Sequence, residues 1–195
     1  MKKVCSMLML AAAALAFQSC GGSSSNDSKA NADSANYTKD TSTNATATGG
    51  IAVVNDDAEF AVAAANGGMA EVELSKLAET KATNAKVKEF AAMMTKDHGG
   101  ANAELMELAK TKNITLPTTV GADEQKTMGD LQAKAGADFD KAYVDVMVKD
   151  HKKTVDLFEE ASKDAKDADI KSFAIKTLPV LKNHLQAIET IQKGM

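Results

Sequence analysis

Four long stretches of helical periodicity constrain the fold of this chain most strongly. Within residues 60–78, 87–108, 139–158 and 170–191, apolar side chains recur at steps of three and four residues. This spacing puts them on one side of an α-helix, so each stretch predicts an amphipathic helix of about 25 residues. Only two of the 195 residues are Pro, which agrees with long uninterrupted helices.

One long break and two short ones set the order of these helices. Leu116-Pro117-Thr118-Thr119 and Gly121 mark the long break, and a shorter helix at about residues 122–134 is expected to cross the bundle after it. Four long helices, two tight turns and one long connection are typical of a four-helix bundle with a crossover. The sequence therefore predicts an all-α domain of this kind over residues 55–195.

Polar side chains at the helix starts predict caps. Asn84 stands where its side chain can cap the second long helix, and Asp56 or Asp57 where it can cap the first. These positions fix where the helices are expected to begin.

Two glycine pairs lie at matched heights on the first two long helices. They are Gly67-Gly68 and Gly99-Gly100. Because a mid-helix Gly costs up to about 1 kcal/mol, their presence needs a structural reason. We expect a close approach of the two helix backbones, with a local kink as the alternative.

The first twenty residues resemble the signal sequence of a bacterial lipoprotein. Two lysines precede an apolar run of roughly 14 residues, which is too short to span a membrane. Ser19-Cys20 then resembles the lipoprotein cleavage box, which implies removal of residues 1–19 and lipidation of Cys20. The alternatives are ordinary cleavage nearby and a free or disulfide-bonded Cys20, although the only other cysteine, Cys5, lies in the segment to be removed.

Residues 20–54 have the composition of a linker, rich in Ser, Thr, Asn and Gly. Such a segment buries too little surface to offset its chain entropy, so we expect a flexible tether behind the lipidated cysteine. Gly21-Gly22 stands where an inner-membrane retention signal has Asp, which favours an outer-membrane lipoprotein with its domain in the periplasm or at the cell surface. Asp33-Ser34-Ala35 resembles the O-glycosylation sequon of Bacteroidetes and makes Ser34 a candidate site.

A family resemblance runs through the rest of the chain. Its motifs are Gly67-Gly68-Met69-Ala70-Glu71-Val72-Glu73-Leu74-Ser75-Lys76-Leu77-Ala78, Val87-Lys88-Glu89-Phe90-Ala91, Met94, Asp97-His98, Leu116-Pro117, Phe139-Asp140, Tyr143, His151, Leu157-Phe158, Leu178-Pro179 and His184-Leu185. Over residues 57–192 they resemble domain-of-unknown-function family 4142. The resemblance implies a ferritin-like four-helix bundle of the bacterial envelope, often described as an outer-membrane protein, with no established activity. Gly99-Gly100 departs from the family pattern, in which helix formers follow the Asp-His pair.

The three histidines of the chain occupy the apolar stripes of three different helices. They are His98, His151 and His184, and Glu71 lies on the stripe of the fourth helix. Counted from the two tight turns at 1.5 Å per residue, all four lie near mid-bundle within roughly 9 Å of one another in height. One carboxylate and three imidazoles that converge from four helices can hold a transition metal such as copper or zinc.

Other interpretations of this cluster stay open. Buried histidines and a buried Glu can also satisfy one another as a polar network, without a metal. A ferritin-type di-iron centre, in contrast, needs Glu-x-x-His on two helices, and Thr95, Val148 and Leu181 stand three residues before the histidines. Di-iron oxidase activity is therefore not expected.

Neighbours of two histidines are further candidates. Met94 and Met147 each lie four residues before a histidine and so on the same helix face, a pairing that suits copper(I). Methionine also fills gaps in cores with few aromatic residues, which is the alternative. Asp97 and Asp150 directly precede a histidine and point away from it by about 100°. We expect them to orient the imidazoles as hydrogen-bond acceptors or to face water.

A nine-residue segment occurs twice in related form. Residues 90–98 and 143–151 share Met, Lys, Asp and His in register at an offset of 53, with Phe replaced by Tyr. This similarity suggests that the second and third long helices hold related places in a pseudo-symmetric bundle.

Composition narrows the function further. The chain contains no Arg and has a formal net charge of −4, so it lacks the strongly basic composition expected of a protein that binds nucleic acid. It has neither a Gly-x-Ser-x-Gly nucleophile nor a phosphate-binding glycine loop, so an enzyme is not expected. We expect a lipid-anchored envelope protein that acts as a binding or stress-related module, with metal binding as the alternative. Its membrane contact would be the lipid, and the sequence names no protein partner.

Overall fold

The regular structure of the described residues is entirely helical. The computed structural model describes residues 27–40 and 53–195. Its helices are α1 (Ser28–Asp40), α3 (Asn55–Lys81), α4 (Ala85–Thr111), α5 (Ala122–Gln132), α6 (Gly136–Asp164) and α7 (Ala168–Lys193). Four of them have 26 to 29 residues, so the predicted all-α bundle and its short connecting helix are confirmed. None of the described helices is long and apolar enough to span a bilayer.

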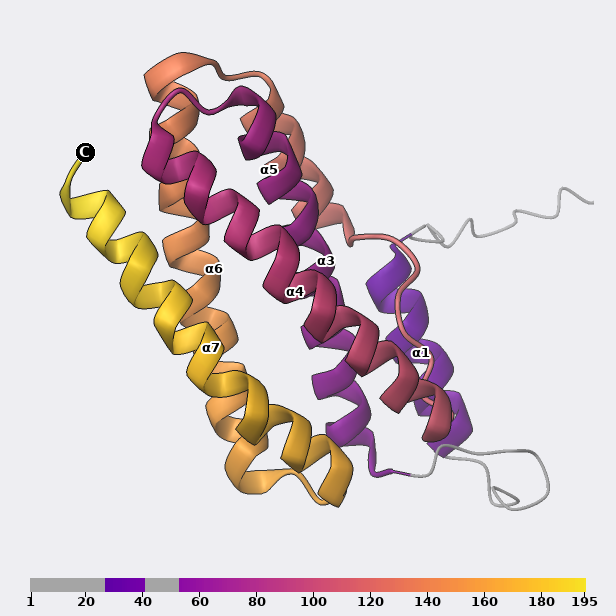
Figure 1. The fold of residues 1–195 in the computed structure, drawn as a ribbon. Coiled ribbons are helices and arrows are strands. Elements are labelled where there is room, and N and C mark those ends of the chain that lie inside the picture. Colours follow the sequence, from indigo (N-terminus) through magenta and orange to yellow (C-terminus); the bar gives the residue numbers. More distant parts are fainter. Residues whose placement is uncertain (1–26, 41–52) are drawn as a thin grey trace, which may run out of the picture.

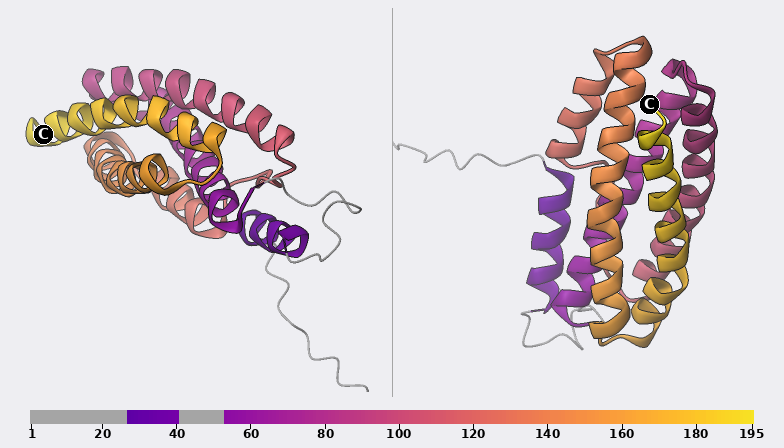
Figure 2. Two further views of the ribbon diagram at one scale, coloured as in Figure 1. Left: turned by 90° about the horizontal axis from the view of Figure 1, so that it is seen from below. Right: turned by 90° about the vertical axis from the view of Figure 1, so that its left-hand side faces the viewer.

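The bundle consists of two antiparallel hairpins. Helix α3 pairs with α4 and α6 with α7, and the hairpins meet through α3 against α6 and α4 against α7. Figures 1 and 2 show that α4 and α6 run in the same direction at diagonally opposite corners of the bundle. Helix α5, which lies between α4 and α6 in the sequence, rises along the bundle. The repeated segments 90–98 and 143–151 thus occupy parallel, diagonal helices.

The cap predictions are half right. Asn84 precedes α4 and accepts a hydrogen bond from the backbone N of Lys86 at 2.9 Å, so this prediction is confirmed. For α3 the prediction is wrong, because the N-cap is Val54, which makes no side-chain cap hydrogen bond. Asp57 is buried in the first turn of α3 and is directed at the other hairpin instead.

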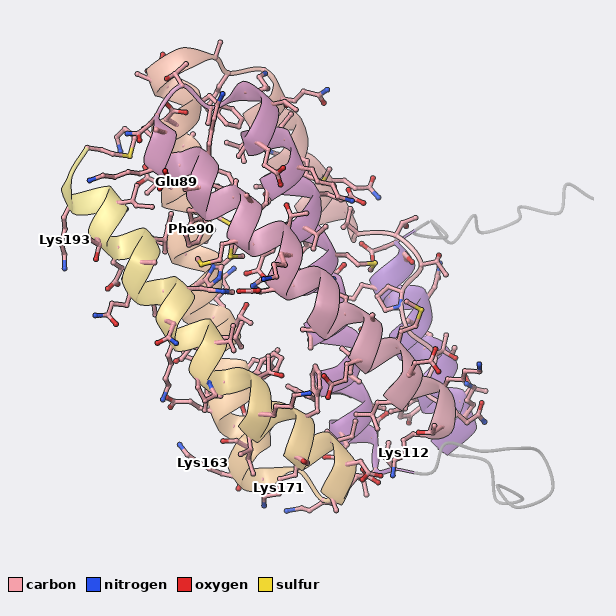
Figure 3. All side chains as sticks on the ribbon, viewed as in Figure 1. Glu89, Phe90, Lys112, Lys163, Lys171 and Lys193 are labelled. Atoms are coloured by element: carbon pink, nitrogen blue, oxygen red, sulfur yellow. The ribbon has the colours of Figure 1, made fainter. Side chains whose placement is uncertain are left out.

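Four acidic groups tie the ends of the two hairpins together. Asp57 accepts hydrogen bonds from the backbone N of Lys166 and Asp167 in the α6–α7 turn, the latter at 2.7 Å. Asp140, buried in α6, does the same for the turn between α3 and α4. At the end of α4, Lys112 (labelled in Figure 3) pairs with Asp167 at 2.8 Å and with Asp169, which fixes α4 to the start of α7.

A polar layer divides the core into two apolar clusters. Each bundle helix contributes residues to both clusters, and the layer lies between them. The aromatic residues of the cluster near the α6–α7 turn are Phe60, Phe158 and Phe173. Those of the other cluster are Phe90, Phe139 and Tyr143. The two clusters hold the helices in register, so the side chains of the intervening layer are positioned from both sides.

The prediction of a flexible tether over residues 20–54 is wrong for residues 28–40, which form α1 against α3. Ala32 and Asn36 are buried on its inner face. The Asn36 side chain donates to the carbonyl of Thr115 at 2.9 Å and accepts from its backbone N at 2.7 Å. The crossover loop has backbone groups that need partners, and α1 supplies them, which stabilises a segment of low hydrophobicity.

The signal peptide, Cys20 and the remainder of the predicted tether lie almost wholly outside the described residues. Of residues 41–54 only Val53 and Val54 are described, and Val53 is buried in the core. Ser34 lies on α1 and is exposed.

The prediction that the paired glycines allow α3 and α4 to pack closely holds in part at one position, Gly68. A Cβ added at Gly68 would collide with the side chain of Asn102 on α4, so this glycine makes room for a side chain of the neighbouring helix. Added Cβ atoms at Gly67, Gly99 and Gly100 would meet nothing within 4 Å. Close packing of α3 against α4 therefore accounts for Gly68 and does not account for the other three glycines.

Candidate metal centre

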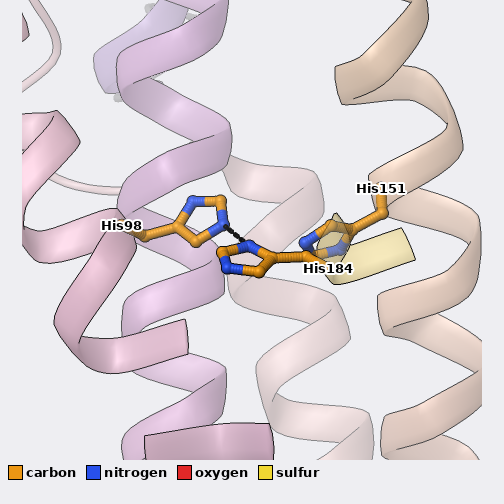
Figure 4. Close-up of side chains that lie close together, drawn as sticks. All are labelled: His98, His151 and His184. Carbon is orange, nitrogen blue, oxygen red and sulfur yellow. Dashed lines mark hydrogen bonds between the residues drawn. The ribbon is translucent and has the colours of Figure 1, made fainter. Parts of the chain in front are cut away.

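One polar side chain from each bundle helix enters the layer between the two core clusters. Glu71 comes from α3, His98 from α4, His151 from α6 and His184 from α7, and each is at most 5% exposed. Ring centroids of the imidazoles lie 5.3 to 5.8 Å apart. One ring nitrogen of each imidazole lies within 4.8 Å of the others, and Figure 4 shows the three rings facing one another.

The other ring nitrogen of each imidazole contacts an oxygen atom. Nδ1 of His98 lies 2.9 Å from Oε2 of Glu71, and Nδ1 of His151 lies 2.9 Å from the carbonyl oxygen of Met147. Nε2 of His184 lies 3.1 Å from Oδ2 of Asp97. Histidines that bind metals almost always donate their second ring N–H to a carboxylate, carbonyl or water, because this fixes the tautomer and the ring orientation.

The ring nitrogens that do not contact an oxygen atom have poor hydrogen-bond partners or none among the described residues. Nε2 of His98 lies 3.3 Å from Nδ1 of His184, so one proton can be shared by that pair. Among the described residues, Nε2 of His151 is fully buried and has no hydrogen-bond partner, whereas Glu71 is paired with His98. Since a buried unsatisfied polar atom costs about 1–3 kcal/mol, a purely structural network leaves this layer incomplete.

The four groups of the layer shift one another's pKa values in different directions. Burial alone would lower the pKa of His98, but the Glu71 carboxylate outweighs it and raises that pKa above its ordinary value. Burial would likewise raise the pKa of Glu71, but the imidazoles, His98 foremost, hold it below its ordinary value. For His151 and His184 burial prevails over the nearby carboxylates and lowers the pKa.

A cavity of about 340 Å³ lies beside the imidazoles, between α4 and α7. His98, His184 and Glu71 form part of its wall. Its apolar lining includes Ala64, Ala101, Leu105, Phe158, Phe173 and Leu181. Glu104 and Lys176, both exposed, also line it and form an ion pair at 2.7 Å that joins α4 to α7.

The structure separates the other predicted site residues into two groups. Asp97 contacts His184, as described above, whereas Asp150 lies 4.0 Å from Lys153 and lines a second cavity on the α5 side, together with Glu71. Burial, followed by the charge of Glu71, raises the pKa of Asp150. Met94 and Met147 are fully buried within the apolar cluster that contains Phe90, which is the packing role considered for them.

Sequence reasoning did not find the cavity. Its lining comes from α3, α4, α6 and α7 and follows no single helical stripe. A signal was present, however, because Ala64 and Ala101 are small residues on stripes where Leu or Phe usually fills a core. Small residues at matched heights on adjacent helices leave space beside the histidines.

The comparisons with known proteins bear on the fold and the family. The family described as "Domain of unknown function (DUF4142)" matches residues 40–191. The solved structure "Crystal structure of DUF305 fragment from Deinococcus radiodurans" is similar with a TM-score of 0.65 and 8% sequence identity, covering 73% of this chain and 99% of that one, which shows a shared fold. A comparison with curated proteins gives no match. Since the family match extends over most of the chain, this protein belongs to the DUF4142 family of domains of unknown function.

Proposed function

We propose that the protein binds one transition-metal ion through His98, His151 and His184. The observation that carries the proposal is the convergence of three buried ring nitrogens within 4.8 Å, each on an imidazole whose other nitrogen contacts an oxygen. Tetrahedral zinc with Zn–N bonds of about 2.0–2.1 Å places two ligand nitrogens roughly 3.3 Å apart. The distance between Nε2 of His98 and Nδ1 of His184 is 3.3 Å, which supports this geometry.

The donor set favours particular metals. Imidazole suits Zn²⁺, Cu²⁺, Co²⁺ and Ni²⁺, and the core position of Met94 and Met147 gives no support for a copper(I) site with thioether ligands. Glu71 is the one carboxylate among the buried residues of this layer, whereas a di-iron centre needs carboxylates from all four helices. The proposed site is therefore mononuclear.

In this proposal Glu71 positions a ligand instead of binding the metal. Its Oε2 faces Nδ1 of His98, and its Oε1 lies 3.4 Å from Nδ1 of His151, so the carboxylate lies on the outer side of both rings. It fixes the ring of His98 and supplies one negative charge close to the cation. Asp97 holds the ring of His184 in the same way.

Titration of the purified full-length protein with Zn²⁺ and Co²⁺ tests this function. We expect one ion per chain, with binding abolished by His98→Gln or His184→Gln and weakened about 10–100-fold by Glu71→Gln. Ser75→Ala is the matched control, because Ser75 is buried on α3 and hydrogen-bonded to Tyr143 outside the site. This variant should bind the metal like the wild type. A folded wild-type chain that binds less than a stoichiometric amount would overturn the proposal.

We also propose that the protein is an outer-membrane lipoprotein anchored through Cys20. The support is the sequence of residues 1–20. The connection from Cys20 to the first described helix is also shorter than the predicted tether over residues 20–54. Six residues separate Cys20 from Asp27, which caps α1 by accepting from the backbone N of Ala30. Even fully extended, this connection reaches only about 25 Å, so the domain is held close to the lipid surface.

Membrane fractionation tests the anchor. Cys20→Ala should move the protein to the soluble fraction without changing its circular dichroism spectrum. Ser23→Ala is a matched control in the same segment and should stay with the membranes. Quantitative sedimentation of Cys20→Ala with the membranes would contradict the lipid anchor.

A further inference from the structure

We infer that the bound metal keeps one coordination position open to the cavity between α4 and α7, where it binds a small neutral molecule with one nitrogen donor and an apolar body. This inference rests on the proposed metal site. It adds to that proposal an exchangeable ligand, its chemical class and its route of entry.

Three protein ligands leave a tetrahedral metal one position short. Structural zinc sites are closed by four protein ligands, whereas sites with three keep the fourth position for water or an exogenous ligand. His151 is fully buried and does not line the cavity, while His98 and His184 do. Two of the three ligands therefore border the cavity, and we place the open position on that side.

The size of the cavity exceeds what a coordinated water needs. A water molecule occupies about 30 Å³, and ligand pockets usually measure about 300–1,000 Å³. The volume of about 340 Å³ thus suits a molecule of roughly ten heavy atoms. Leu105, Phe158, Phe173 and Leu181 line it and would contact an apolar body, since all four belong to the core cluster on that side of the layer.

The charges around the cavity favour a neutral ligand. A divalent metal brings two positive charges, which the carboxylates of Glu71 and Asp97 beside the imidazoles offset. At the rim, Glu104 and Lys176 form an exposed ion pair, and the exposed side chain of Lys96 also lines the cavity. A neutral donor such as the unprotonated nitrogen of an imidazole therefore suits a metal whose charge is already offset.

Cobalt-loaded full-length protein gives a direct test, because the visible spectrum of Co²⁺ reports a change of ligand. The probes are imidazole and 4-phenylimidazole, which share the donor and differ in the apolar body. Ala101→Trp fills the cavity from α4, and Val180→Trp narrows it from α7. Ala103→Trp is the matched control, because Ala103 is exposed on the same helix outside the cavity.

We expect both probes to change the cobalt spectrum saturably, with 4-phenylimidazole at least tenfold tighter. Ala101→Trp or Val180→Trp should weaken 4-phenylimidazole at least tenfold, and Ala103→Trp less than twofold. If cobalt binds but neither probe changes its spectrum, or the phenyl group gives no gain, the inference is wrong and the metal site stands. If no cobalt binds, the proposed metal site and this inference are both wrong.

Discussion

Glu71 is the residue on which the electrostatics of the polar layer depend. It is 2% exposed, and its nearest polar neighbours are the imidazoles of His98 and His151. A buried carboxylate stays ionised only where opposite charge compensates for lost hydration. His98 provides that charge in the absence of a metal, and in our account the cation shares this role when it is bound.

The chain has only three histidines, so NMR can follow the titration of each one. In the metal-free protein His98 should titrate above the ordinary value near 6.5, and His151 and His184 below it. A raised pKa means that His98 stabilises the fold below this value and that the contribution is lost as the pH rises through its folded pKa. Glu71→Gln should lower the pKa of His98, because it removes the partner charge. An unchanged His98 titration in that variant would contradict the assigned ion pair.

Apolar replacements of two histidines should have different effects on the metal-free protein. His98→Leu leaves the Glu71 carboxylate without its closest partner and should lower the free energy of unfolding by about 3–5 kcal/mol. His151→Leu removes Nε2, which has no partner among the described residues, together with the hydrogen bond of Nδ1 to the Met147 carbonyl, so its effect should be within about 1 kcal/mol of zero. Urea denaturation measures both. Equal destabilisation by the two replacements would show that the layer is a conventional satisfied network.

At the scale of elements, the long helices could be predicted from the sequence and α1 could not. Stripes such as Val87, Phe90 and Met94 repeat over many turns, so the helical period stands out against chance. Helix α1 buries mainly Ala32 and Asn36, and its stability comes from hydrogen bonds to a loop about 80 residues further along the chain. No local pattern encodes such a contact, and the composition alone indicates a linker.

The Asn36 contacts predict how α1 is held. Asn36→Ala should leave the backbone N–H and carbonyl of Thr115 without partners and lower the free energy of unfolding by about 1–3 kcal/mol. Hydrogen exchange at the Thr115 amide should become faster in the same variant. Asn31→Ala is the control, because Asn31 is exposed on the same helix and should have little effect on either measurement. Unchanged exchange at Thr115 would mean that α1 is not docked on the crossover loop.

For the whole molecule, the position of the site follows from the packing of two hairpins. The number of residues between each tight turn and each site residue can be counted in the sequence. This count predicts that the three histidines and Glu71 lie at one height in the bundle. Which ring nitrogens face inward depends on rotamers and on partners such as the Met147 carbonyl, and sequence spacing does not specify these. The cavity likewise arises from the junction of α4 with α7, which is a property of the assembled bundle.

Metal binding should stabilise the whole bundle, because the three ligands join α4, α6 and α7. At a free Zn²⁺ concentration 100 times the dissociation constant, the added stability is about 2.7 kcal/mol. For a domain of this size that corresponds to a rise in Tm of roughly 5–11 °C. Calorimetry with and without Zn²⁺ measures it, and His184→Gln should show no rise. A wild-type Tm that does not respond to Zn²⁺ would argue against a site within the core.

X-ray absorption at the zinc edge of the loaded full-length protein is the most direct test of the histidine site, because it reports the identity and distance of the atoms bound to the metal. We expect three imidazole nitrogens at about 2.0–2.1 Å and one further light atom from the cavity side. A sulfur shell near 2.3 Å, or an oxygen shell without imidazole scattering, would contradict the proposed site, because the metal would then lie outside the layer formed by His98, His151 and His184.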